Sequence, residues 1–242
     1  MADFGLSEEQ EMLRELAHEF ARDSVRPHAE HWDLENEFPL KAIGEAHALG
    51  LTNLHIPAEY GGMGMGIADE VLVIEEFAWG DPGFSTAAYS NGLTAGPIIT
   101  GGTEEQKEEY LGRLVKEPKI ASYCVTEPAA GSDVASIETT AVRDGDHYIL
   151  NGEKMFITGA GHADWFFVLG YTDKSAGYKG MSAFIVESGF DGVSLGKKES
   201  NMGQRASDTR GVRFDEVHVP VENLVGGVEG KGWFNAMKAF DL

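Results

Sequence analysis

The character of the chain changes within residues 117–133, which read EPKIASYCVTEPAAGSD. Before Pro118, apolar residues recur at intervals of three and four, as they do along one buried face of a helix. After Pro118, short runs of β-branched and aromatic residues are separated by Gly and Asp, which favours strands joined by tight turns. We therefore expect an α+β fold, in which an all-α helical N-terminal domain is followed by an antiparallel β-barrel or sandwich domain.

The spacing of apolar residues and turn signals places the expected elements. Helices are expected over residues 7–31, 39–50, 67–79 and 103–115, and Ser7 and Thr103 are suited to cap two of them. Strands are expected over residues 120–125, 139–142, 148–150, 165–171, 182–186 and 211–219, with turns at Asp144-Gly145 and Asn151-Gly152. We expect domains at 1–118 and 119–225, and a Gly-rich loop with the beginning of a helix at 226–242.

Composition excludes several classes of protein. The 242 residues include 19 Lys and Arg against 40 Asp and Glu, a net charge of −21, which argues against a nucleic-acid partner. No apolar run approaches the roughly 20 residues that would cross a membrane, so no membrane partner is expected. The first ten residues resemble no signal peptide, and the single cysteine, Cys124, excludes an internal disulfide framework. We expect a cytoplasmic protein or one of an organelle matrix.

Three features that could carry chemistry have simpler interpretations. Residues 61–66 read GGMGMG, but no convincing strand precedes them, which favours a loop between helices over a nucleotide-binding loop. His28 and His31 could form half of a metal site, but no further ligands have matching spacing, so we expect no metal. Cys124 lies in an apolar run, which favours a buried, inert thiol.

Basic residues of the second half gather in one stretch. They are Lys197, Lys198, Arg205, Arg210 and Arg213. Such a stretch could meet an anionic small molecule or be an ordinary charged surface, and composition alone leaves both open.

Three separated segments together resemble the acyl-CoA dehydrogenases, flavoproteins that oxidise acyl-CoA thioesters. They are residues 124–133 (CVTEPAAGSD), 151–158 (NGEKMFIT) and 201–209 (NMGQRASDT). The first satisfies the family signature at every position, and the other two are similar to its NGxKxWIT and MGxRxSxT patterns. The segments occur in the family's order and spacing, and the resemblance extends over the entire chain, nearest to the short- and medium-chain members.

The resemblance implies that FAD is the cofactor and assigns roles to seven residues. The main chain around Tyr123, Val125 and Thr126 would hydrogen-bond the flavin ring, Phe156 would pack on the ring face, and the Thr158 hydroxyl would lie near N5. Ser132 would lie near the pyrophosphate and the CoA, and Asp241 would lie at the beginning of a CoA-contacting segment. The sequence departs from the family at Phe156, where a Trp is usual.

The resemblance also implies the reaction and its partners. An acyl-CoA would be converted to the trans-2-enoyl-CoA, as in fatty acid β-oxidation, with electrons passed to an electron-transfer flavoprotein, and the complete protein would be a homotetramer. The family continues into a C-terminal helical domain that carries the catalytic Glu. That domain is missing here, so we assign no catalytic residue in this chain and expect the 242 residues alone to be inactive. The alternatives are a non-catalytic or partner-dependent subunit, or a related flavin oxidase or monooxygenase.

Overall fold

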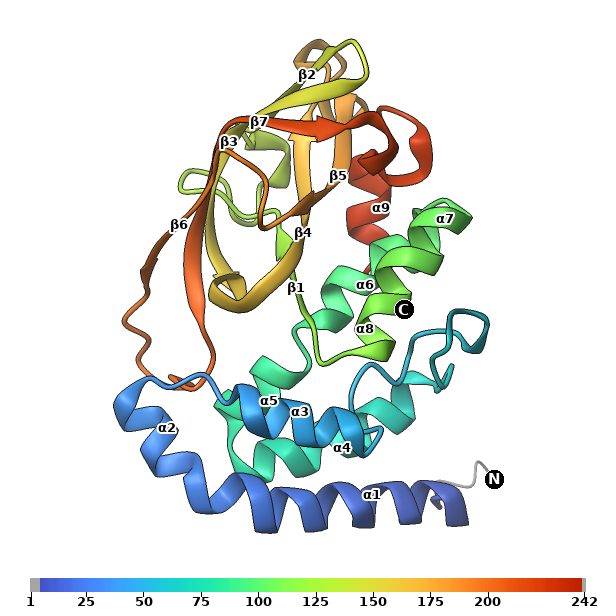
Figure 1. The fold of residues 1–242 in the computed structure, drawn as a ribbon, viewed down its shortest axis with the longest axis vertical. Coiled ribbons are helices and arrows are strands. Elements are labelled where there is room, and N and C mark those ends of the chain that lie inside the picture. Colours follow the sequence, from blue (N-terminus) through green and yellow to red (C-terminus); the bar gives the residue numbers. More distant parts are fainter. Residues whose placement is uncertain (1–4, 241–242) are drawn as a thin grey trace. The chain divides into compact units, whose positions relative to one another are not determined.

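The computed structural model describes residues 5–240, which divide into two compact units (Figure 1). The first unit contains the residues up to Tyr89 together with Ser200–Ser207. The second contains Ser90–Glu199 and the residues from Asp208 onward. The chain therefore leaves the second unit for eight residues, between β6 (Val193–Lys198) and β7 (Thr209–Pro220), and then returns to it.

Helices build the first unit. Helix α1 (Glu8–Phe20) begins with the expected capping box, in which Ser7 Oγ accepts from the Gln10 amide at 3.2 Å. The helix expected over 7–31 is not continuous: a π turn at Ala21–Val25 and a 3-10 turn at Arg26–His28 lead into α2 (Ala29–Glu35). Pro27 explains part of this change because it has no amide hydrogen to continue an α-helical ladder.

The other helices of the first unit pack around a core of aromatic side chains. It contains α3 (Leu40–Ala48), a 3-10 turn (Ala58–Tyr60), α4 (Ile67–Gly80) and α5 (Pro82–Ala88). The rings of Phe77 and Phe84 lie 5.0 Å apart, and Trp32 stacks on Phe84 at 6.0 Å. Gly62, in the glycine-rich loop, packs against the Ile56 carbonyl so closely that a Cβ would lie 1.9 Å from its oxygen. The loop joins helical segments, as its sequence indicates.

The second unit begins with further helices. They are α6 (Asn91–Gly101), α7 (Glu104–Gln106), a π turn (Lys107–Leu111) and α8 (Gly112–Lys116), and α9 (Gly232–Lys238) follows the sheet. The spacing of apolar residues does not predict α5 or α6. Both are rich in small residues, and α6 contains Pro97, so neither has the apolar stripe of an amphipathic helix.

The sheet of the second unit is curled and mixed. Its strands are β1 (Ile120–Cys124), β2 (Thr140–Asp144), β3 (His147–Thr158), β4 (Ala163–Tyr171), β5 (Met181–Glu187), β6 and β7. Their order is β1-β4-β2-β3-β7-β6, with β5 paired to β4 (Figure 1). The α+β class is confirmed. Most pairs are antiparallel, as expected, but β4 pairs in parallel with β1 and, at one position, with β2. Parallel strands need a long connection, and the one between β1 and β4 contains the β2–β3 hairpin.

One of the two expected turns is confirmed and the other is wrong. Gly145, at φ +63°, turns the chain between β2 and β3, where Asp144 faces His147. Asn151-Gly152 lies inside β3, at a shift in register between Leu150 and Gly152. Gly152 is needed there for close packing against Thr139 rather than for a turn, since a Cβ would lie 2.2 Å from the Thr139 Oγ1.

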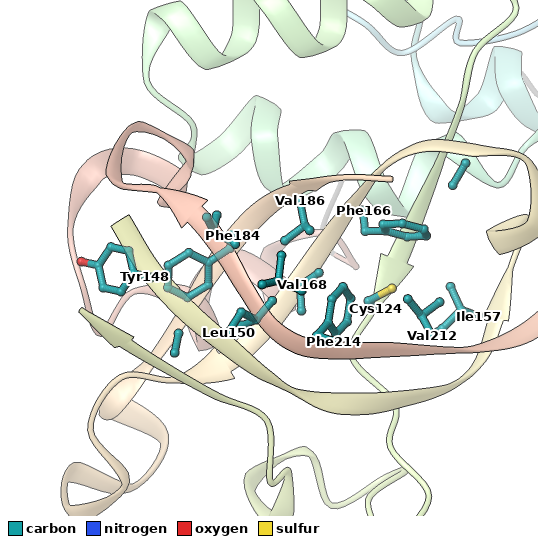
Figure 2. Packing of buried hydrophobic residues seen from close by; sticks show 14 of the residues in the cluster. Cys124, Tyr148, Leu150, Ile157, Phe166, Val168, Phe184, Val186, Val212 and Phe214 are labelled. Atoms are coloured by element: carbon teal, nitrogen blue, oxygen red, sulfur yellow. The ribbon is translucent and has the colours of Figure 1, made fainter. Parts of the chain in front are cut away.

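Apolar side chains fill the inside of the curled sheet. Figure 2 shows Phe166, Val168, Phe184 and Phe214 among them, and all four are at most 2% exposed. Cys124 belongs to the same cluster, and its complete burial raises the pKa of its thiol. The expected burial of Cys124 is therefore confirmed. Within residues 5–240, no helix combines the length and apolar character needed to cross a membrane.

Candidate functional site

Two segments of the second unit run side by side in opposite directions. The Ser122 hydroxyl donates to the Thr158 carbonyl at 2.7 Å, and the Met155 amide donates to the Thr126 carbonyl at 2.9 Å. One segment continues β1 and the other ends β3. Five of the six residues expected at the cofactor site lie on these two segments: Tyr123, Val125, Thr126, Phe156 and Thr158.

Tyr123 uses its side chain for packing. Its ring stacks on Phe167 at 5.2 Å with an angle of 2° between the planes, and its hydroxyl donates to the Ala236 carbonyl at 3.0 Å. Burial raises the pKa of this hydroxyl above its ordinary range. Because the phenol is already engaged, any contact that Tyr123 makes with a ligand would come from its main chain.

Phe156 has an unusual backbone and an exposed ring. Its φ is +59°, which is rare for an aromatic residue, and its side chain is 59% exposed. The register between β3 and β7 shifts between Lys154 and Ile157, so Phe156 lies in a bulge. A bulge at the end of a strand redirects side chains, and here an aromatic ring faces outward instead of packing in the core.

The loop that follows Thr126 offers unused amides. Glu127 and Ala130 exchange backbone hydrogen bonds of 2.9 and 3.1 Å, which closes a tight turn. Gly131, Ser132 and Asp133 follow in exposed positions, and within residues 5–240 their amides donate to no other group. A Cβ on Gly131 would have no atom within 4 Å. Successive exposed amides with open space before them suit an anion such as a phosphate.

A buried ion pair lies behind the two segments. The Lys154 ammonium is 2.8 Å from Glu127 Oε1, and the two side chains are 0% and 5% exposed. Burial lowers the pKa of Lys154, and the negative charge of Glu127 opposes that effect. For Glu127 burial would raise the pKa, but Lys154 and donors from residues 138 and 139 hold it below its ordinary value.

The Lys154–Glu127 pair is not among the site residues predicted from the sequence. Lys154 and Glu127 both stand inside the segments that carry the family resemblance. A signal was present, because each is a charged residue within an otherwise apolar or small-residue stretch next to a strand.

Asp241, His31 and the basic stretch are not part of these two segments of the sequence. Asp241 lies outside the described residues. His31 pairs with Glu37 at 3.1 Å, and no group of three potential metal ligands occurs between residues 5 and 240. In the basic stretch, Arg210 forms an ion pair with Asp208 and Arg213 forms one with Asp215. Much of the positive charge of this stretch is therefore balanced by nearby carboxylates.

The site combines an outward aromatic ring, two half-buried threonines and a row of free amides. An aromatic face suits a planar heterocycle, and the amides suit a phosphate attached to it. Two carboxylates close to these segments are engaged, Glu127 by Lys154 and Asp208 by Arg210. An arrangement of this kind is suited to a large heterocyclic, phosphate-bearing cofactor.

Comparison with protein families identifies the class to which the protein belongs. The acyl-CoA dehydrogenase N-terminal domain matches residues 7–118, and the acyl-CoA dehydrogenase middle domain matches residues 122–217. The chain therefore belongs to the acyl-CoA dehydrogenase family.

Individual relatives agree with this assignment. The chain is 46% identical to the "Probable medium-chain specific acyl-CoA dehydrogenase 2, mitochondrial" of Caenorhabditis briggsae, over 99% of its own length and 59% of the relative. Butyryl-CoA dehydrogenase from Megasphaera elsdenii superposes with a TM-score of 0.94 at 38% identity, over 99% of this chain and 64% of that one. An acyl-CoA dehydrogenase from Bacillus anthracis, solved in complex with FAD, gives 0.89 at 36% identity, over 98% and 41% of the two chains. The chain thus spans less than two thirds of each of these relatives.

Proposed function

We propose that this chain is the flavin-binding part of an enzyme that oxidises acyl-CoA thioesters. The observation that carries the proposal is the pair of facing segments, 122–126 and 155–158, with the free amides of residues 131–133 following one of them. A bound flavin is stabilised by hydrogen-bonding groups at the polar edge of its ring, by an aromatic side chain against the ring, and by N–H groups that donate to its pyrophosphate. These residues can supply all three.

FAD, when bound, supplies the electron-accepting chemistry. The main chain of Val125 and Thr126 would hold the polar edge of the ring, and Phe156 would cover one face. The hydroxyl of Thr158 would donate to a ring nitrogen, and the amide of Ser132 would hold the pyrophosphate. These groups lie on or directly after strands of one sheet, so they can fix the position of the cofactor without large movements.

We further propose the reaction of the complete protein from the family resemblance. An acyl-CoA would lose hydrogen from its α and β carbons to give the trans-2-enoyl-CoA, and an electron-transfer flavoprotein would take the electrons. A base is required for the α-proton. From the family resemblance we propose that this base lies outside the 242 residues, which span 59% of the curated relative, in a tetramer of the complete protein.

Cofactor titration tests the binding step. We expect FAD to bind the purified chain with quenching of its fluorescence, and riboflavin to bind more weakly because it lacks the phosphates that the residue 131–133 amides would hold. Equal affinity for the two flavins, or no binding of either, would contradict the assignment of this site.

The acyl-CoA reaction is tested on the complete protein. We expect butyryl- to palmitoyl-CoA substrates to bleach the visible flavin absorbance without consuming oxygen. Oxygen consumption would instead indicate an oxidase or monooxygenase, and a requirement for a second chain would indicate a partner-dependent subunit.

A further inference from the structure

The buried Lys154 ammonium has three acceptors around it. They are the Val125 carbonyl at 3.2 Å, Glu127 Oε1 at 2.8 Å and the Leu169 carbonyl at 2.7 Å. An ammonium carries three protons, so its hydrogen-bonding capacity is matched by these groups. Two of the three acceptors belong to residues on either side of Thr126.

Glu127 is held from its other side by donors that come later in the chain. Its Oε1 accepts from the Thr139 hydroxyl at 2.5 Å and the Thr139 amide at 3.0 Å, and its Oε2 accepts from the Glu138 amide at 2.5 Å. The ion pair therefore ties the Val125–Glu127 corner to β4 on one side and to the beginning of β2 on the other. Such a pair has little freedom to change its geometry.

The contact with the Val125 carbonyl determines which way the next amide points. Within the described residues every peptide bond is trans, so the C=O of Val125 and the N–H of Thr126 point in opposite directions. Lys154 draws that carbonyl inward. The Thr126 amide must then point away from Lys154, and within residues 5–240 it donates to no other group.

We propose that Lys154 is a positioning residue, which holds the Val125–Thr126 peptide in the orientation that presents the Thr126 amide to a ligand, with Glu127 as its counter-ion. The identity of that ligand as a flavin rests on the proposed function. The orientation of the peptide does not depend on it. A buried pair that only stabilised the fold would be replaceable by neutral side chains of similar size without an effect on binding.

Two variants separate positioning from stability. Lys154→Met leaves the Glu127 carboxylate buried without its counter-ion, so the melting temperature of this variant should fall. Lys154→Met/Glu127→Gln removes both charges, so the melting temperature should recover in large part. We expect FAD to bind about tenfold or more weakly to both, since neither holds the Val125 carbonyl. Recovery of FAD affinity together with the melting temperature in the double variant would overturn the proposal.

Glu127→Gln alone is the complementary variant. It retains Lys154 and its contact with the Val125 carbonyl, so stability should fall while FAD affinity changes by only about twofold. The matched control is Lys41→Met, which removes a lysine that is 93% exposed and 3.6 Å from Glu45. A loss of FAD affinity in Glu127→Gln as large as that in Lys154→Met would contradict the role assigned to Lys154.

A measurement without ligand decides the inference independently of FAD. The carbonyl carbon shift of Val125 and the amide nitrogen shift of Thr126 should move in Lys154→Met and stay near the parent values in Lys41→Met. If FAD does not bind to the parent chain, the proposed function is wrong, and these two resonances still test the peptide orientation. Shifts in Lys154→Met no larger than those in Lys41→Met would refute it.

Discussion

Phe156 combines an exposed ring with a backbone conformation that few residues accept. Asn tolerates a positive φ because its side chain can hydrogen-bond locally, whereas a β-branched residue is strained there. We expect the free energy of unfolding of Phe156→Asn to lie between the parent value and about 1 kcal/mol above it. For Phe156→Val we expect a value about 1 kcal/mol below that of the parent. Denaturant unfolding measures both. Equal stability of the two variants would show that the backbone stores no strain at this position.

The lowered pKa of Glu127 predicts a specific acid sensitivity. In the unfolded chain this carboxyl takes up a proton near its ordinary pKa of about 4.5, whereas in the folded protein Lys154, Thr139 and the Glu138 amide favour the charged form. The stabilisation is therefore complete above pH 4.5 and is lost as the pH falls through the folded pKa. We expect Glu127→Gln to flatten this part of the stability profile, measured by unfolding at a series of pH values. An unchanged slope would place the acid sensitivity at other carboxyls.

At the scale of elements, the β2–β3 region depends on one close contact. Gly152→Ala would place a Cβ 2.2 Å from the Thr139 hydroxyl and 2.8 Å from the Thr139 Cα, so one of the backbones must move. We expect a loss of about 2–3 kcal/mol in the free energy of unfolding. Gly189→Ala is the control because no atom lies within 4 Å of its added Cβ, and it should be nearly neutral. Equal effects of the two substitutions would mean that β3 adjusts freely.

The elements that the sequence predicts well are those with a strong local pattern. The residues 39–50 and 67–79 have apolar stripes and become α3 and α4, and the expected strands all appear. The apolar pattern does not predict helix α6, since this helix is buried among other elements and contains Pro97. Strand β6 also escapes prediction, because most of its side chains are exposed and it is held by pairing with β7.

The candidate site was only partly accessible from sequence. Motif resemblance selects residues 123–126 and 156–158, and the structure places these segments beside each other. The three-way contact of Lys154 could not be predicted, because Leu169 and Val125 become neighbours of the ammonium only when β1, β3 and β4 assemble. The strain at Phe156 likewise depends on a register shift between β3 and β7 rather than on local propensity.

At the scale of the whole molecule, residues 200–207 bind to the first unit although β6 and β7 on either side belong to the second. The Arg205 guanidinium pairs with the Asp33 carboxylate, and the Arg205 amide donates to it at 3.0 Å. The Thr86 hydroxyl donates to the Gln204 side chain at 2.9 Å. The first unit is therefore completed by residues that lie far along the chain.

A chain cut after folding tests this contact. With a protease site inserted between Tyr89 and Ser90, we expect the two fragments to remain associated after cleavage. Asp33→Ala should weaken the association about tenfold or more because it removes the Asp33 carboxylate that pairs with the Arg205 guanidinium. Asp23→Ala is the control, since Asp23 pairs with Arg22 in the same fragment. If the two fragments of the unsubstituted protein separate after cleavage, or if the two substitutions weaken the association equally, residues 200–207 do not hold the fragments together.

The excursion at 200–207 also has an evolutionary consequence. A single gene recombination event near codon 90 would join the helical unit of one ancestor to the sheet of another, and residues 200–207 would come with the sheet. The receiving surface around Asp33 and Thr86 would then face a foreign segment. The helical unit can therefore be exchanged between genes only if the codons for residues 200–207 are exchanged with it in a second event, or if those codons change to match the new unit.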